Sequence, residues 1–132
     1  MSVYDVTALG ELLVDFTADG TASAQGNLLF EANPGGAPSN MLAMLAKLGK
    51  NTAFIGKVGR DLFGDMLRDT LRAVHVGDQG LMVDETANTT LAFVPTKPGG
   101  DREFSFYRKP GADMLLGEAD LDPALVTDCT IF

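Results

Sequence analysis

Two adjacent glycines, Gly35 and Gly36, stand directly before an apolar stretch in the segment NPGGAPSNMLAMLAKLG, residues 33–49. Glycine lets the backbone turn sharply and approach a bound molecule, and a helix N-terminus favours electron-rich groups. Asn40, in the first turn of the expected helix, can both donate and accept hydrogen bonds, which suits a ligand that carries hydroxyl groups. The alternative is a plain turn, in which Asn40 only satisfies the start of the helix.

Asp15 is a second candidate for binding chemistry, because it ends the otherwise apolar stretch ELLVDF, residues 11–16. An ionised aspartate is rarely buried without a partner. Ligands bind at the carboxyl ends of the strands in a parallel sheet, and a carboxylate there can hold sugar hydroxyls by charge-assisted hydrogen bonds. An exposed loop aspartate is the competing interpretation.

The familiar phosphate-binding motifs do not account for these glycines. A phosphate loop requires G-x-x-x-x-G-K-[ST], and no Lys-Ser or Lys-Thr pair follows Gly36. A dinucleotide fingerprint requires G-x-G-x-x-G directly after the first strand, whereas these glycines are adjacent and come roughly twenty residues later. The glycines therefore either turn the chain or approach a ligand other than a nucleotide.

Composition narrows the class of protein. The chain has 132 residues, of which 45% are apolar and 21% charged, as expected for a single globular domain. A net charge of −8 without a basic run argues against nucleic-acid or anionic-membrane partners. One cysteine, Cys129, excludes an internal disulfide, and we find neither a secretion signal nor an apolar run long enough to span a bilayer. We expect a cytoplasmic protein.

The order of expected elements predicts an α/β fold, with a parallel sheet that carries helices on both faces. Residues 18–34 read as a loop or as short strands of a flap, and the strand pair at 89–108 as a small β lid. The apolar positions of the helix that starts at Pro38 predict that it is heavily buried, with Met41, Met44, Leu45 and Leu48 on one face. The other expected elements are strands at 3–9, 12–16, 51–59 and 129–132, a helix at 61–76 capped by Asp61, and a short helical piece near 111–116.

The last residues, TDCTIF, read as a buried strand that has only begun. A parallel strand needs neighbours on the sheet. We therefore expect the chain to be the N-terminal part of a longer protein.

Five blocks, in order, carry a resemblance to a known family: GELLVDF, PGGAPSNMLAMLAKLG, AFIGKVGRDLFGDML, TTLAFV and GDREFSFYRKPGAD. Together they resemble the N-terminal half of the PfkB (ribokinase-like) carbohydrate kinases, with bacterial fructokinases the nearest match and 2-keto-3-deoxygluconate kinases a near second. The resemblance runs from Val6 to Phe132. Leu42 departs from the first signature of the family, which has Ser, Thr or Ala at that position.

The resemblance implies that residues 1–132 form the N-terminal part of one ribokinase-like domain, with lid elements at about 17–34 and 88–108. It implies transfer of the γ-phosphoryl group of ATP to a sugar hydroxyl with Mg²⁺, most closely fructose to fructose 6-phosphate. It also implies a homodimer in which the lids of two subunits pair. By position, the resemblance assigns sugar binding to Asp15, Gly35, Gly36, Asn40, Phe106 and Arg108.

Two of these positions can be weighed on their residue types. Phe106 and Arg108 lie two apart on an expected strand and project from one face. Arg108 suits a carboxylate through two parallel hydrogen bonds and can also serve a neutral sugar, whereas a surface ion pair is the alternative.

The resemblance places the catalytic machinery elsewhere. The family has a second signature, a glycine-rich anion hole followed by an aspartate base, and these 132 residues contain no such run. We therefore assign no catalytic, nucleotide or metal residue here and expect this chain alone to be inactive. Two hypotheses stay open: part of a sugar kinase, specific for fructose or for 2-keto-3-deoxygluconate, or a non-catalytic sugar-binding or regulatory protein.

Overall fold

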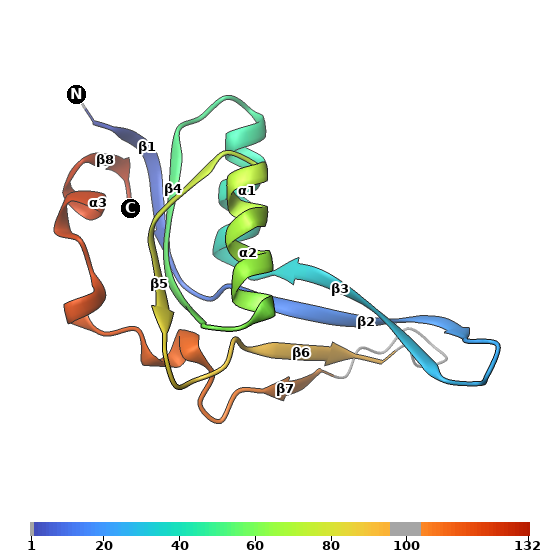
Figure 1. Ribbon diagram of the computed structural model, residues 1–132. Helices are drawn as coiled ribbons and strands as arrows, with labels where there is room; N and C mark the ends of the chain where they lie inside the picture. The colour runs from blue at the N-terminus through green and yellow to red at the C-terminus, as the bar shows by residue number, and fades with distance from the viewer. Residues whose placement is uncertain (1, 96–103) are drawn as a thin grey trace.

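The computed structural model describes residues 2–95 and 104–132 and contains two four-stranded sheets (Figure 1). One sheet forms a core with the helices, and the other extends away from it as an arm (Figure 1). We call the second sheet the lid. The expected turn TKPGGD of the lid hairpin lies outside the described residues.

The core sheet is entirely parallel, as predicted. Its strands follow the order β5-β4-β1-β8, and β1 lies between β4 and β8. The strands are β1 (Tyr4–Leu9), β4 (Thr52–Gly59), β5 (Val76–Asp84) and β8 (Cys129–Ile131).

Helices cover both faces of the core sheet, which confirms the predicted layering. α1 (Ala37–Lys47) and α2 (Leu62–Ala73) lie on one face and enclose the main apolar cluster around Phe54 and Leu67. The opposite face carries a smaller cluster around Ile55 and Leu125. Its cover consists of short elements: η1 (Ala112–Leu115), η2 (Glu118–Asp120) and α3 (Pro123–Thr127).

The lid is a mixed sheet with the strand order β3-β2-β6-β7. β2 pairs antiparallel with β3 and parallel with β6, and β6 pairs antiparallel with β7. Residues 18–34, which were expected to form a loop or short strands, therefore lie mostly in two long strands, β2 and β3. The lid strands are β2 (Leu13–Ala22), β3 (Leu28–Gly35), β6 (Leu91–Val94) and β7 (Ser105–Tyr107).

The predicted burial of α1 is wrong. Met41, Met44 and Leu48 are 47%, 59% and 70% exposed, and the helix instead buries Leu42, which is fully enclosed. Ala43 and Ala46 pack on the core beside it, because small side chains let the helix approach the sheet closely. Since nearly every face of this helix is apolar, the spacing of its large residues did not identify the buried face.

The second helix matches its prediction closely. The Asp61 carboxylate accepts a hydrogen bond from the Gly64 amide, as an N-cap does, and Leu67 and Leu71 are buried.

The following strand, β5, was missed, because glycines and an aspartate interrupt its apolar pattern. Gly80 belongs there for a packing reason: a Cβ would lie 2.7 Å from the Phe54 carbonyl oxygen on β4.

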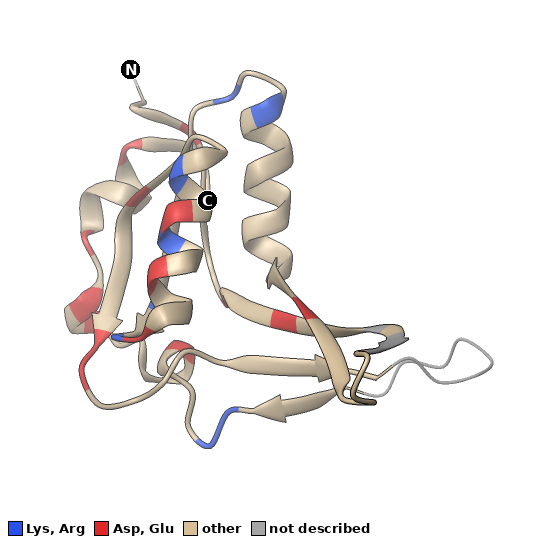
Figure 2. Cartoon of the chain, turned by 45° about the vertical axis from the view of Figure 1, so that its right-hand side comes forward, with Lys and Arg blue, Asp and Glu red and all other residues tan. Residues whose placement is uncertain are grey.

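Charged residues are mixed rather than segregated. Acidic and basic positions alternate along α2, and Lys and Arg positions in this view do not gather on one face (Figure 2). None of the helices in the described part of the chain is both long and apolar enough to cross a membrane.

Candidate functional site

A pocket opens where the chain leaves the core and enters the lid. It has a volume of about 340 Å³ and draws on the β1–β2 turn, β2, the start of α1 and the β7 region. Four of the residues predicted to bind a ligand share this pocket. Its lining residues are Glu11, Leu13, Asp15, Gly36, Ala37, Asn40, Phe104 and Phe106.

Strand register explains why Asp15 and Phe106 meet. Asp15 on β2 pairs with Ala92 on β6, and Ala92 pairs with Phe106 on β7. Directly paired residues project from the same face of a sheet, so Asp15 and Phe106 lie on one face with the small Ala92 between them. We call this the pocket face of the lid.

The opposite face of the lid is aromatic. The Phe16 and Phe93 rings stack with centroids 5.0 Å apart, and Phe30 and Tyr107 each contact Phe93 edge-on. The Phe16 ring also meets Phe63 of α2 at 5.4 Å, which fastens the base of the lid to the core. Alternation along the strands therefore separates the pocket face, where Asp15 lies beside Phe106, from this aromatic cluster around Phe93.

The Asp15 carboxylate has no hydrogen-bond or ion-pair partner within residues 2–95 and 104–132. Partial burial raises the pKa of this carboxyl group, because removal from water disfavours the charged form. A partly desolvated acceptor with unused lone pairs is suited to accept hydrogen bonds from ligand hydroxyl groups.

Both glycines are sterically required at this corner, whether it serves only as a turn or also approaches a ligand. A Cβ on Gly35 would collide with the Asp15 carboxylate, and a Cβ on Gly36 would collide with the Glu11 carbonyl oxygen. Gly36 also has φ of 122°, a conformation that other residues rarely adopt. The pair therefore lets β3 enter α1 while the backbone stays against the pocket wall.

The N-terminus of α1 points its first turn at the pocket. Gly36 is the N-cap and provides no side-chain cap. The backbone N–H of Asn40 donates to the Gly36 carbonyl oxygen at 3.0 Å, which leaves the Asn40 side chain out of this bond. The Asn40 side chain is exposed and lines the pocket together with Ala37. A ligand here would meet an exposed amide group and the positive end of the helix dipole.

Arg108 is placed differently from the other predicted residues. It lines a second cavity of about 580 Å³ along β6 and β7, beside Leu91 and Tyr107. Its Nη2 atom lies 2.5 Å from Asp113 Oδ2, and its Nη1 atom lies 3.6 Å from Glu11 Oε2. Because Glu11 lines the first pocket, Arg108 borders the Asp15 site through a carboxylate rather than directly.

Sequence reasoning missed Glu11 and Phe104 as pocket residues. Phe104 lies two residues from Phe106, so strand alternation could have placed both on the pocket face. Glu11 is a charged residue in the turn between two apolar strands, and this position alone is a weaker indication of a pocket residue.

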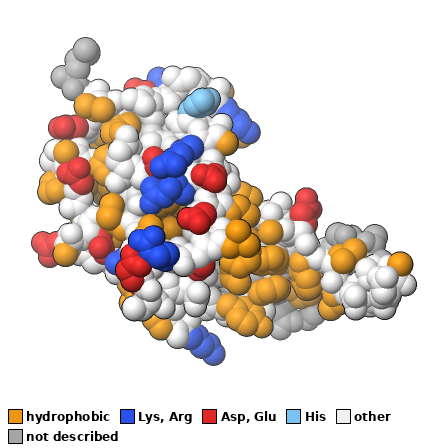
Figure 3. All heavy atoms as spheres, in the orientation of Figure 1, with side chains coloured by type: hydrophobic (Ala, Val, Ile, Leu, Met, Phe, Trp, Pro, Cys, Tyr) orange, Lys and Arg blue, Asp and Glu red, His pale blue; other side chains and the backbone are white. Residues whose placement is uncertain are grey.

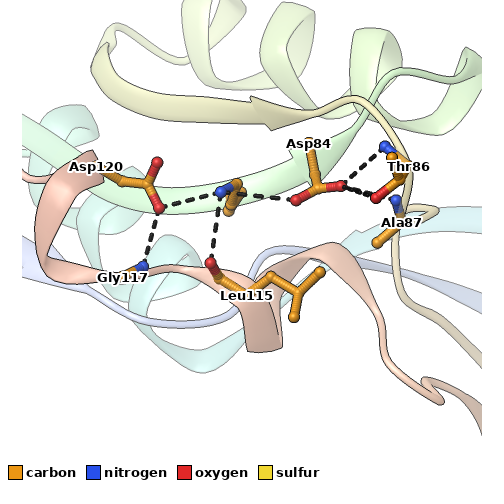
Figure 4. A network of polar contacts seen from close by, with 7 residues as sticks. Asp84, Thr86, Ala87, Leu115, Gly117 and Asp120 are labelled. Atoms are coloured by element: carbon orange, nitrogen blue, oxygen red, sulfur yellow. Dashed lines mark hydrogen bonds and ion pairs between the residues drawn. The ribbon is translucent and has the colours of Figure 1, made fainter.

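Lys57, for which the sequence supported no specific role, is the centre of a polar network. Figure 4 labels its partners Asp84, Leu115 and Asp120. The Nζ atom of Lys57 lies 3.0 Å from Asp120 Oδ2 and 3.6 Å from Asp84 Oδ2. Hydrogen bonds from the amides of Ala87 and Thr86 lower the pKa of Asp84 to about 2. The network joins β4, β5 and η2, so its role is structural.

The comparisons with known proteins agree with this architecture. The model of the pfkB family carbohydrate kinases matches residues 4–128. The chain belongs to this family. Fructokinase-2 of Zea mays is 47% identical over 129 residues, which cover 96% of this chain and 38% of that protein. The chain thus spans less than half the length of this relative.

Solved structures agree in fold as well. A fructokinase from Xylella fastidiosa superposes with a TM-score of 0.90 at 37% identity, over 96% of this chain and 39% of that one. A second structure of the fructokinase from this organism, with bound ATP, gives a TM-score of 0.86 over 37% of its chain. The predicted ribokinase-like α/β fold with a small lid is confirmed.

Proposed function

We propose that this chain is the sugar-binding, N-terminal part of an ATP-dependent kinase that converts fructose to fructose 6-phosphate. The observation that carries the proposal is the Asp15 carboxylate, which is partly desolvated and unpartnered among the described residues. The names of the relatives support a fructose substrate. The family supports phosphoryl transfer.

Each pocket residue has a distinct part in this proposal. Asp15 accepts hydrogen bonds from sugar hydroxyls, and the Asn40 amide donates to or accepts from a neighbouring hydroxyl. Gly35 and Gly36 keep the hinge between lid and core thin enough for the sugar to lie against backbone. Phe106 covers an apolar face of the sugar ring, as aromatic side chains in binding sites do.

A neutral sugar fits the charges around the pocket better than an acid sugar such as 2-keto-3-deoxygluconate. The Arg108 guanidinium already faces the carboxylates of Asp113 and Glu11. Asp15 and Glu11 make the pocket wall acidic, and the charge of Arg108 is already balanced by Asp113, so a substrate carboxylate would be repelled.

ATP and Mg²⁺ enter the proposal through the family and through the ATP-bound fructokinase of X. fastidiosa. Over residues 2–95 and 104–132, no group of three or more His, Cys, Asp and Glu side chains is arranged to hold a metal ion. We therefore assign neither a metal ligand nor the catalytic base among these described residues. In the proposal, both come from the remainder of the kinase.

The aromatic face of the lid supports the expected homodimer. Hydrophobic side chains gather over the lid next to α2 (Figure 3). Tyr107 and Phe30 on this face are 65% and 39% exposed, and Leu28 is 78% exposed. A second copy that packs its lid here would remove this surface from water. We keep a cytoplasmic location as part of the proposal.

Phosphorylation by the full-length kinase that carries this chain tests the function. The assay couples ADP release to absorbance, with fructose, 2-keto-3-deoxygluconate and ribose as acceptors at saturating MgATP. We expect kcat/KM for fructose to exceed the value for the other two by at least tenfold. Preference for the acid sugar would replace fructose as substrate, whereas sugar binding without ADP release would favour the non-catalytic alternative.

A further inference from the structure

Arg108 follows the last lid strand, β7, and reaches back to two other parts of the molecule. Asp113 belongs to η1 on the core, and Glu11 belongs to the turn between β1 and β2. The guanidinium thus joins the outer lid strand, the core and the pocket wall.

The two carboxylates hold Arg108 in different ways. Asp113 accepts from two nitrogens, Nη2 at 2.5 Å and Nε at 3.3 Å, and its side chain is only 2% exposed. Glu11 faces a single nitrogen at 3.6 Å, and its side chain is 38% exposed. A two-nitrogen contact with a buried carboxylate fixes the plane of a guanidinium, whereas a single long contact does not.

Asp113 is itself fixed by its surroundings. The Thr90 hydroxyl, at the foot of β6, donates to Asp113 Oδ1 at 2.5 Å. Gly111 permits this approach, because a Cβ there would collide with the Thr90 hydroxyl. The anchor for Arg108 is therefore built from buried groups, independently of the pocket.

From this geometry we infer that Asp113 is a positioning residue for the sugar site: it holds Arg108 by Nε and Nη2, so that Nη1 is presented at the pocket wall. Glu11 is the exchangeable partner of Nη1 and yields it when a sugar hydroxyl arrives. This inference rests on the proposed function, because it gives Arg108 a substrate contact. It adds a buried residue that touches no substrate yet sets sugar affinity.

The test is a double-mutant cycle in the full-length kinase, with Asp113→Asn, Arg108→Gln and the combined variant. We expect Asp113→Asn to raise the KM for fructose about tenfold or more, with kcat and the KM for ATP within twofold of wild type. When Arg108→Gln is already present, adding Asp113→Asn should change the KM for fructose by less than a further twofold. Asp69→Asn, the same substitution at an exposed site on α2, is the matched control and should leave all three constants unchanged.

The outcomes separate the inference from the function. If wild type phosphorylates no sugar, the proposed function fails and the inference falls with it. If wild type is active, three results would each overturn the inference but not the function. The fructose KM of Asp113→Asn could be unchanged, or its KM values for fructose and ATP could rise equally. In the third case, the double variant would show the product of the two single-variant effects on the fructose KM. Should Asp113→Asn fail to fold, Thr90→Val removes one hydrogen bond to Asp113 and keeps the carboxylate. It should raise the fructose KM severalfold, and no rise would overturn the inference.

Discussion

Replacing Asp15 with asparagine should weaken sugar binding and, at the same time, stabilise the empty protein. The substitution keeps the shape of the side chain and removes its charge. Burial raises the pKa of this carboxyl group, and the described residues provide no partner that repays the lost hydration. The ionised Asp15 carboxylate therefore lowers the free energy of unfolding of the empty protein, and a bound ligand would offset this loss.

The size of the binding loss follows from the hydrogen bonds at stake. Bonds to a charged acceptor contribute about 1.5–3 kcal/mol each, against about 1 kcal/mol for neutral pairs. Exchanging one such charged bond for a neutral one costs about 0.5–2 kcal/mol, which corresponds to a rise of roughly 2- to 30-fold in the dissociation constant for fructose. The KM for ATP should stay within about twofold, because Asp15 lies in the proposed sugar pocket. Asp15→Ala should weaken sugar use further.

The stability gain has a definite pH dependence. A raised carboxyl pKa in the folded state means that the ionised carboxylate destabilises the fold at pH values well above that pKa. This cost fades as pH falls through the raised pKa and is gone below the ordinary aspartate value of 3.8. Asp15→Asn should therefore melt above wild type at pH 7 and at the same temperature near pH 3.

Calorimetric titration with fructose and thermal melts at both pH values measure the two effects, with Asp69→Asn as control. A lower melting temperature at pH 7 together with unchanged fructose affinity would refute the reasoning. It would mean that Asp15 has structural partners and no ligand role.

Three further predictions concern the packing and the charges. Gly36→Ala should abolish sugar binding or folding, because the added Cβ collides with the Glu11 carbonyl oxygen. Gly49→Ala is its control, since Gly49 has φ of 83° but open space around it, and should lower the free energy of chemical unfolding by about 1 kcal/mol. Leu42→Ala should cost about 2–5 kcal/mol and the exposed Met44→Ala far less, and equal losses would contradict the assigned face of α1. Asp84→Asn should lower the melting temperature at pH 7. Its deficit should shrink as pH falls from about 4 through 2, where the wild-type carboxylate itself protonates, and a constant deficit would argue against the ionised network.

The parts of the fold that the sequence predicted well are those with strong local signals. α2 has one apolar face and an aspartate cap, so its position followed directly. The helix after the glycine pair was also located correctly, but its buried face was not, because Leu42 and the neighbouring alanines compete with larger apolar residues at other angles. Contact with the sheet decides that face, and this contact is not local in sequence.

The candidate site shows the same division. Gly36 and Asn40 were found from residue type and from their position at a helix start, and the structure brings them into one pocket with Asp15. Asp15 was singled out from residue type, but its expected place at the carboxyl end of a parallel strand is wrong, because it lies near the start of the lid strand β2. Residue type did not reveal that Arg108 is held by a buried carboxylate, since this depends on where the chain places η1 after the lid. The strand β5 was missed for a related reason: its glycines fit tight packing between neighbouring segments, which a single-sequence pattern does not register.

The most direct test of the account is a crystal structure of the full-length kinase with fructose bound. The account predicts that a sugar hydroxyl lies within hydrogen-bond distance of an Asp15 carboxylate oxygen and that the sugar contacts the Gly36 backbone and the Asn40 side chain. Fructose bound elsewhere, with the Asp15 carboxylate facing solvent, would contradict it.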